Sequence, residues 1–290
     1  MSSRQSGALF LTCVLLCSLA PAQEGSSEWV RGVSGEARLD GSITQIQAEQ
    51  QARNEALAEA LKRKGIRVST AALLDQSESV NTARDLHNSN VRFVNIVQTA
   101  TQGIVTAIEN ERWRTIETPQ ADPSRPPIHT YRVTLDARVT IPQGSPDPDF
   151  KIEPELDKVA YRDGDHVILR VTSTKKCYLH IFNIAADSVV MLVPSGIQEP
   201  RLIAPDEPLY FPPDGYSWTA QVPSGWPESE ELVMVVATTS DRSFTAGEVS
   251  AAQDYVATRH AARTELMSWI ATIPQSEVAY AWETLRIVQK

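Results

Sequence analysis

The chain has 290 residues, of which 42% are hydrophobic and 22% charged, values that are normal for a folded globular protein. This length allows two domains that each bury a core. The 36 acidic and 27 basic residues give a net charge of −9, and no cluster of Lys and Arg in the sequence offsets it. The sequence therefore lacks the electrostatic pattern of a nucleic-acid-binding protein.

The first 22 residues have the pattern of a cleaved signal peptide. Arg4 supplies a positive charge, residues 8–20 form an apolar core, and Ala20-Pro21-Ala22 places small residues at the −3 and −1 positions of a cleavage site. The apolar core is too short to span a bilayer, which takes about 20 apolar residues. We therefore expect export to the periplasm or the extracellular space, with a mature N-terminus at Gln23.

Lipid anchoring is the less favoured alternative. Val14-Leu15-Leu16 precede Cys17, whereas a lipoprotein signal places small residues before its cysteine. Cleavage after Ala22 leaves Cys177 as the only cysteine, so no internal disulfide is expected. Because no second apolar stretch approaches membrane-spanning length, the mature protein is expected to have no transmembrane segment.

A proline-rich segment divides the chain. Residues 142–149 contain three prolines and a glycine, which disfavour both a helix and a central strand. We expect a linker there, with an N-terminal domain at residues 27–141 and a C-terminal domain at residues 150–290.

The N-terminal domain is predicted to be α+β. A first strand is expected because apolar residues of one parity recur at Trp29, Val33, Ala37 and Leu39. A helix follows over residues 42–65, with Ser42 and Gln45 as a capping box and a narrow stripe of alanines that lets it lie close to a sheet. Residues 70–87 and 90–102 lean towards helix, and residues 104–117 towards strand. Residues 131–141 alternate strictly between apolar and polar residues, which indicates a half-buried strand.

The C-terminal domain is predicted to be mainly β. In residues 161–171 a turn around Gly164 is expected to precede a strand with Val167, Leu169 and Val171 on one face. Further strands are expected in residues 177–184, 188–193, 216–222 and 231–240, separated by turns rich in Pro and Gly. Short strands at this spacing indicate a sandwich or a partly open barrel. Residues 250–273 are predicted to form a C-terminal helix, and residues 277–289 one more strand.

Motifs in residues 27–141 resemble the N-terminal domain of flagellar assembly protein T and of related exported envelope proteins. They are Gly35-Glu36-Ala37 in the first strand, the helix segment Ala52-Arg53-Asn54-Glu55-Ala56-Leu57, and the late alternating strand from Tyr131 to Val139. These are packing motifs, and the resemblance implies an assembly role.

The C-terminal part resembles a bacterial domain of unknown function, family 4384, which is found C-terminally in many exported proteins. The motifs are Tyr161-Arg162-Asp163-Gly164-Asp165, a Tyr-Leu strand at Cys177–Phe182, and Met191-Leu192-Val193-Pro194-Ser195. Where that family often has glycine, this chain has Ala186-Asp187-Ser188. Neither resemblance brings an established catalytic set.

Cys177 and His180 are the first candidates for chemistry. Side chains three residues apart on a strand point to opposite faces, so we expect no contact between them and no catalytic residues here. The sequence has no His-Glu-x-x-His or Cys-x-x-Cys spacing, and neither a metal nor a cofactor is predicted. Asp163-Gly164-Asp165 is interpreted as a turn rather than a calcium loop.

Aromatic residues near the "PPDG" turn are the candidate binding residues. Tyr210, Phe211, Tyr216 and Trp218 flank this turn in a loop-rich region, where binding residues are common. Filling of the core is the alternative role for the same side chains.

These patterns support three hypotheses. The leading one is a non-enzymatic exported bacterial envelope protein that mediates protein or envelope assembly contacts, with another envelope component as its partner. The second is a secreted ligand-binding or sensory module with a pocket near Tyr216 and Trp218. The third is a hydrolase whose residues converge only in the fold. The oligomeric state stays open.

Overall fold

The computed structural model describes residues 26–39, 43–66, 90, 103–120, 126–185, 188–194, 202–251 and 257–289. The predicted signal peptide and most of the two segments predicted as helices at residues 70–87 and 90–102 lie outside these ranges. Among the described helices, none is long and apolar enough to cross a membrane.

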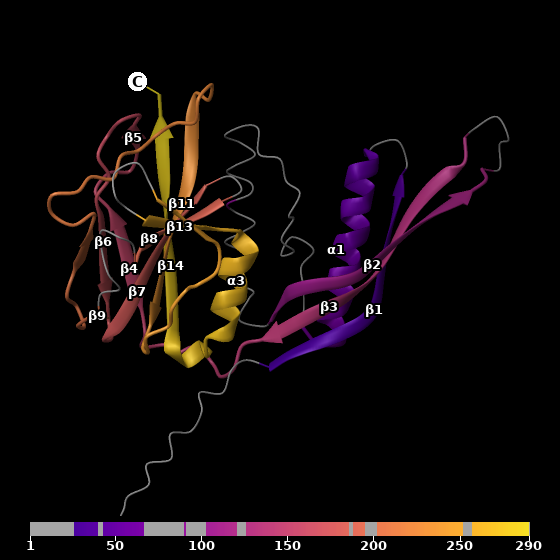
Figure 1. The fold of residues 1–290 in the computed structure, drawn as a ribbon, viewed down its shortest axis with the longest axis horizontal. Helices are drawn as coiled ribbons and strands as arrows, with labels where there is room; N and C mark the ends of the chain where they lie inside the picture. Colours follow the sequence, from indigo (N-terminus) through magenta and orange to yellow (C-terminus); the bar gives the residue numbers. More distant parts are fainter. Residues whose placement is uncertain are drawn as a thin grey trace, which may run out of the picture.

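The N-terminal part is an antiparallel three-stranded sheet with one helix packed across it (Figure 1). Its strands are β1 (Ser26–Leu39), β2 (Ile104–Thr118) and β3 (Ile128–Ile141), in the order β1-β3-β2. Helix α1 (Gln45–Arg63) lies on one face. The predicted α+β architecture and the alanine stripe are confirmed, because Ala48, Ala52, Ala56 and Ala60 are fully buried.

Two details of this part differ from the sequence prediction. The capping box is formed by Thr44 and Gln47, two residues after the predicted pair, and the helix begins at Gln45. Strand β1 contains a bulge between Val30 and Val33, where Gly32 adopts a φ of 62°. The bulge inverts the alternation, so that Val30 is buried and Trp29 lies beside Arg138 on the opposite face of the sheet.

The C-terminal part contains two sheets and a helix. The smaller sheet has the order β10-β6-β4, from β4 (Ile152–Leu156), β6 (Leu169–Ser173) and β10 (Leu209–Phe211). The larger has the order β12-β13-β8-β7-β11-β14-β5, with β9 paired to β7. Its strands are β5 (Tyr161–Arg162), β7 (Cys177–Ala185), β8 (Ser188–Val193), β9 (Leu202–Ile203), β11 (Glu228–Thr238), β12 (Glu248–Ala251), β13 (Ala257–Ala261) and β14 (Val278–Val288).

The larger sheet is covered on both faces. One face packs against the smaller sheet, through a core that joins residues such as Leu179 and Val235 to Leu169 and Phe211. The other face packs against α3 (Arg263–Thr272), whose Leu266 and other apolar side chains contact this sheet. The prediction of a mainly β domain with a C-terminal helix is confirmed, and the described sheets form an open, sandwich-like arrangement without a closed barrel.

Two secondary-structure predictions in this part are wrong. Residues 257–261, which were expected to be helical, form strand β13, and only Arg263–Thr272 is α-helix. Pairing of β13 with β8 outweighs the helix propensity of an alanine-rich segment. Residues 216–222 form no named strand, and Thr219 makes only an isolated bridge to His166.

The two parts of the chain are in contact. Ile104, at the start of β2, is buried in the core that α3 forms with the larger sheet. Asn90 Nδ2 donates to the carbonyl oxygen of Glu230 at 2.9 Å. The predicted linker at residues 142–149 contains no helix or strand, and the carbonyl oxygen of Gln143 accepts a hydrogen bond from the backbone N–H of Gln275 at 2.8 Å.

Candidate functional site

Cys177 and His180 lie on opposite faces of β7. Cys177 is fully buried in the core between the two sheets, together with Leu179 and Ile181. His180 is 1% exposed and packs on the α3 side, with its ring centroid 4.9 Å from that of Trp269. The two side chains therefore do not form a nucleophile and base pair, as the alternation of the strand predicted.

Burial keeps both groups uncharged at neutral pH. It raises the pKa of the Cys177 thiol, because the thiolate is disfavoured in an apolar core. Burial also lowers the pKa of His180 to about 4. A hydrogen bond to the Arg242 backbone and the negative charge of Asp241 raise this pKa, but their effect is smaller than that of burial. A neutral thiol without an adjacent base is a packing group, which is the behaviour of most buried cysteines.

The Asp163-Gly164-Asp165 motif forms a turn. Gly164 has a φ of 86°, and the Asp165 N–H donates to the Arg162 carbonyl oxygen at 2.9 Å. Asp163 Oδ1 accepts from the Val222 N–H, and Asp165 Oδ2 from the Arg162 N–H, which lowers the pKa of Asp165. The carboxylates thus fix the backbone around the turn, and no group of three metal-ligating side chains occurs within the described ranges.

The four predicted binding residues divide into two pairs. Phe211 is 4% exposed and belongs to the core, where its ring contacts Trp218 edge to face at a centroid distance of 5.7 Å. Trp218 is partly buried against the same core. Phe211 and Trp218 thus fill the core, which is the alternative role that the sequence left open for the four aromatic residues. They hold the two ends of the loop between them against the sandwich.

Tyr210 and Tyr216 are instead exposed to solvent, with exposed fractions of 52% and 55%. Tyr210 points away from the core because it lies between Leu209 and Phe211, which are buried on a strand of alternating faces. Tyr216 lies in the loop that Phe211 and Trp218 close, where its N–H donates to the carbonyl oxygen of Pro213 at 3.1 Å.

The outer face of the smaller sheet places Tyr210 in a row with two charged residues. Tyr210 is the register partner of Arg170, and Arg170 is the register partner of Glu155. Arg170 Nη1 lies 3.0 Å from Glu155 Oε2 in an exposed ion pair. We define the outer row as Tyr210, Arg170 and Glu155. Its Tyr and Arg are the residue types that dominate the binding energy of protein interfaces.

A polar pair lies on the larger sheet outside this row. Glu231 accepts a hydrogen bond from Asn183 Nδ2 at 2.6 Å, and burial raises the pKa of its carboxyl. Asn183 Oδ1 is buried without a hydrogen-bond partner among the described residues. Asn183 is the register partner of Val233, which is fully buried in the core between the two sheets, so the pair borders that core.

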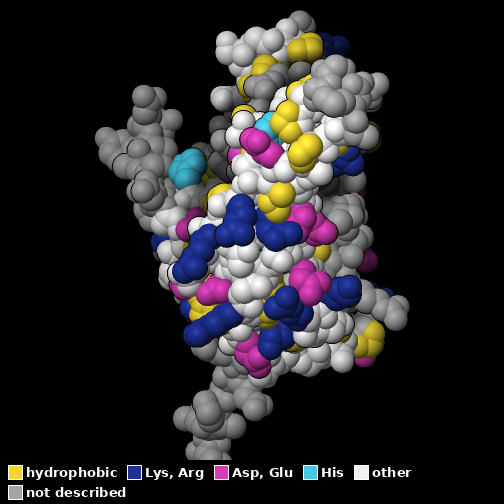
Figure 2. Space-filling model, turned by 90° about the vertical axis from the view of Figure 1, so that its right-hand side faces the viewer, with side chains coloured by type: hydrophobic (Ala, Val, Ile, Leu, Met, Phe, Trp, Pro, Cys, Tyr) yellow, Lys and Arg dark blue, Asp and Glu magenta, His cyan; other side chains and the backbone are white. Residues whose placement is uncertain are grey.

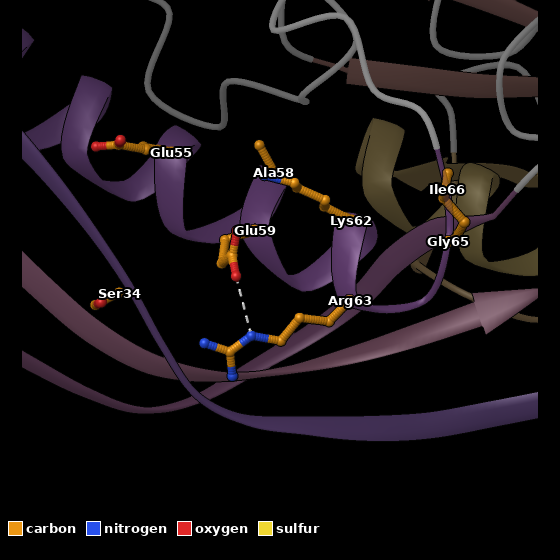
Figure 3. A pocket seen from close by; sticks show the side chains of 8 residues that line it. All are labelled: Ser34, Glu55, Ala58, Glu59, Lys62, Arg63, Gly65 and Ile66. Carbon is orange, nitrogen blue, oxygen red and sulfur yellow. Dashed lines mark hydrogen bonds and ion pairs between the residues drawn. The ribbon is translucent and has the colours of Figure 1, made fainter.

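An open hollow of ≈ 640 Å³ lies beside α1 in the N-terminal part (Figure 3). Its lining is mostly from the C-terminal half of the helix: Ser34, Glu55, Ala58, Glu59, Lys62, Arg63, Gly65 and Ile66. Arg63 Nε forms an ion pair with Glu59 at 3.1 Å, and Glu55 accepts from the Glu36 N–H at 2.7 Å. Three of the charged side chains of this lining, Glu55, Glu59 and Arg63, are therefore already paired within the fold.

Sequence reasoning missed a basic surface. Figure 2 shows Lys and Arg side chains gathered on one side of the molecule, with fewer acidic side chains between them. On the face of the N-terminal sheet opposite α1, register places Arg114 of β2 directly opposite Arg132 of β3. Arg112 lies two residues from Arg114 on β2, and Arg138 lies further along β3 on the same face. The statement that no basic cluster exists holds for the linear sequence only, because strand pairing assembles this one.

The fold and surfaces described above define a β-rich protein with a small α+β part and a sandwich-like part. Comparison with protein families gives a match over residues 160–241 to a family described as Domain of unknown function (DUF4384). The matched segment contains β5 to β11, including Tyr210 and Tyr216. The expected similarity of the C-terminal part is therefore confirmed.

The comparisons give no support to the resemblance of residues 27–141 to flagellar assembly protein T. No curated protein matches the chain.

Proposed function

We propose that this protein is a non-enzymatic, exported bacterial envelope protein that mediates protein contacts in the envelope. The observation that carries the proposal is the outer row together with Tyr216. They present one exposed tyrosine on the smaller sheet and one on the loop that follows β10. Tyrosine brings a large contact area at a small cost in conformational entropy, and Arg170 beside it adds a directional donor.

The smaller sheet gives this surface a fixed geometry. Tyr210 lies between two buried neighbours, and the Phe211–Trp218 contact holds the loop that carries Tyr216. A surface that is ordered before binding loses less entropy when a partner binds. Because Phe211 and Trp218 fill the space beneath the loop, a protein partner fits this region better than a small molecule in a pocket.

The signal-peptide pattern supports the cellular setting of the proposal. The signal-peptide pattern in residues 1–22 favours the periplasm or the extracellular space. In this setting the partner is another envelope component.

A photo-crosslinking experiment tests this proposal. A photoreactive phenylalanine analogue replaces Tyr210 in the full-length protein produced in its own cells, and the adducts are identified by mass spectrometry. Ile46, which is 71% exposed on α1, is the control position. We expect a discrete adduct with one protein from position 210, and loss of the envelope phenotype in the Tyr210→Ala/Tyr216→Ala variant. No adduct at position 210 together with an unchanged phenotype would overturn the proposal.

A further inference from the structure

The face of the N-terminal sheet opposite α1 carries five arginines from three strands. We define the arginine face as Arg38 of β1, Arg112 and Arg114 of β2, and Arg132 and Arg138 of β3. Register places them on the same side, since Arg132 pairs with Arg114 and Arg138 pairs with Trp29, while the intervening Val133 and Ala137 are buried towards α1.

Three of these arginines have side chains that form no ion pair or hydrogen bond with any other residue of the described ranges: Arg38, Arg112 and Arg114. All three are exposed. Arg132 forms an ion pair with Glu36, and Arg138 stacks over the Trp29 ring at 4.7 Å from its centroid. The arginine face thus keeps donors available for a partner, and the two paired arginines are held in place by their neighbours.

The pairing of Arg114 with Arg132 is unfavourable for the isolated protein. The two residues are directly opposite each other on adjacent strands, and like charges in that position destabilise a sheet. The ion pair of Arg132 with Glu36 offsets part of this repulsion, whereas Arg114 has no ion pair among the described residues. A bound anion would offset the repulsion.

The arginine face stands out against the charge of the rest of the chain. Residues 142–290 contain 21 acidic and 12 basic residues, so that the net negative charge lies in the C-terminal part. The basic residues of this face are all arginine, whose planar guanidinium binds carboxylate or phosphate through two parallel hydrogen bonds.

Two features favour a protein partner over a membrane or a nucleic acid. The sheet twists along its length, and its β2–β3 hairpin extends beyond α1, so the face is not flat (Figure 1). Acidic residues also lie at fixed places among the arginines, namely Glu36, Glu109 and Asp136. These acidic side chains repel the phosphates of a membrane surface or a nucleic acid. A folded protein surface can place acidic groups opposite the arginines and basic or neutral groups opposite the carboxylates.

We propose that the arginine face docks an acidic surface of a partner protein, through carboxylates that bind Arg112, Arg114 and their neighbours. This site is separate from the outer row and Tyr216, and it rests on the proposed function only in taking the partner to be a protein. The partner class is defined by its charge: clustered Asp and Glu side chains on a folded surface.

Binding of poly-L-glutamate to the full mature protein tests the charge preference, measured by calorimetry at low and at high ionic strength. The variant is Arg112→Gln/Arg114→Gln, and the control is Arg162→Gln/Arg286→Gln, which removes the same charge from exposed positions of the C-terminal part. We expect about tenfold weaker binding for the variant, wild-type binding for the control, and loss of binding at high salt.

The same measurements include outcomes that contradict the proposal. Equal binding by wild type and variant, or equal weakening by variant and control, would overturn it. Tighter binding to phosphatidylglycerol vesicles or to a short DNA duplex through the same two arginines would replace the protein partner by a membrane or a nucleic acid. The Tyr210→Ala/Tyr216→Ala variant should bind poly-L-glutamate as wild type, so that failure here and failure of the proposed function are distinguishable.

The thermal midpoint of each variant checks the fold. Because Arg112 and Arg114 are exposed and Arg114 faces Arg132, the Arg112→Gln/Arg114→Gln variant should be as stable as wild type or more stable. Weaker binding with an unchanged or higher midpoint supports the proposal, whereas a lower midpoint assigns a structural role to these arginines and contradicts it.

Discussion

Gly35 of β1 lies directly against the carbonyl oxygen of Ala52 in α1. A Cβ atom built on Gly35 would stand 2.1 Å from that oxygen and 2.4 Å from the backbone nitrogen of Ala56. Both contacts are with the helix backbone, which cannot rotate away. The helix and the sheet therefore touch through a residue without a side chain and a stripe of alanines.

We predict that Gly35→Ala destabilises the protein by about 3 kcal/mol, because α1 must move away from the sheet to admit the methyl group. The control is Gly32→Ala, at a bulge position with a φ of 62° and open space around the missing Cβ. It should cost only about 1 kcal/mol, which reflects backbone strain alone. Urea unfolding of both variants measures the difference, and equal losses would contradict the close approach.

Strict alternation made β3 and the buried face of the N-terminal sheet predictable. The apolar residues of β3 from Val133 to Val139 are buried as that pattern requires. The arginine face was not predictable from the same rule. Strand β2 contains register shifts at Val105/Ala107 and at Glu109/Arg112. Because each shift changes the alternation of side chains along β2, odd and even positions in the sequence do not show which β2 side chains lie on the same face of the sheet as the arginines of β3.

The candidate site was predicted in part. A strand of three residues is too short to show a period, so the sequence could not separate the buried Phe211 from the exposed Tyr210. The outer row was not visible for a different reason. Glu155, Arg170 and Tyr210 are far apart in the sequence and are brought together only by strand pairing.

The buried imidazole of His180 should make stability depend on pH. Its pKa falls from 6.5 to about 4 on folding, because burial disfavours the charged form. Between these two values the unfolded chain binds more protons than the folded chain, so the free energy of unfolding decreases as pH falls through this window. The full loss from this group amounts to about 3 kcal/mol, reached near pH 4.

Urea unfolding at a series of pH values from neutral to pH 4 measures this slope. The control is His180→Phe, which keeps an aromatic ring beside Trp269 and removes the titrating group. Its stability should fall less steeply over the same range. A wild-type slope that His180→Phe reproduces would assign the pH dependence to other groups, such as the carboxyl of Asp165, whose lowered pKa also makes the free energy of unfolding decrease as pH falls.

Limited proteolysis with a protease of broad specificity should cut first in the linker. Residues 144–146 are exposed and lack regular structure, which are the properties of sites that proteases cut. The two fragments should stay associated after the cut, because Ile104 is buried in the core beside α3. First cleavage within residues 160–240, with the linker intact, would contradict the two-domain plan.

Cys177→Ala should leave biological activity intact and lower the free energy of unfolding by about 1 kcal/mol. Cys177 is fully buried between the two sheets and His180 is on the other face of β7, so the loss is one of packing alone. His180→Ala should cost more, about 3 kcal/mol, because it removes an aromatic ring from the core beside α3. The His180 side chain is 1% exposed, so its loss leaves a space in the core.

Thiol labelling of the native protein near neutral pH provides the independent measurement. A neutral, buried thiol should react slowly, and the rate should rise when urea unfolds the chain. Rapid labelling of the native protein, together with loss of the envelope phenotype in both Cys177→Ala and His180→Phe at unchanged stability, would contradict the packing role. The pair would then have to be treated as reactive groups, brought together by a rearrangement of β7.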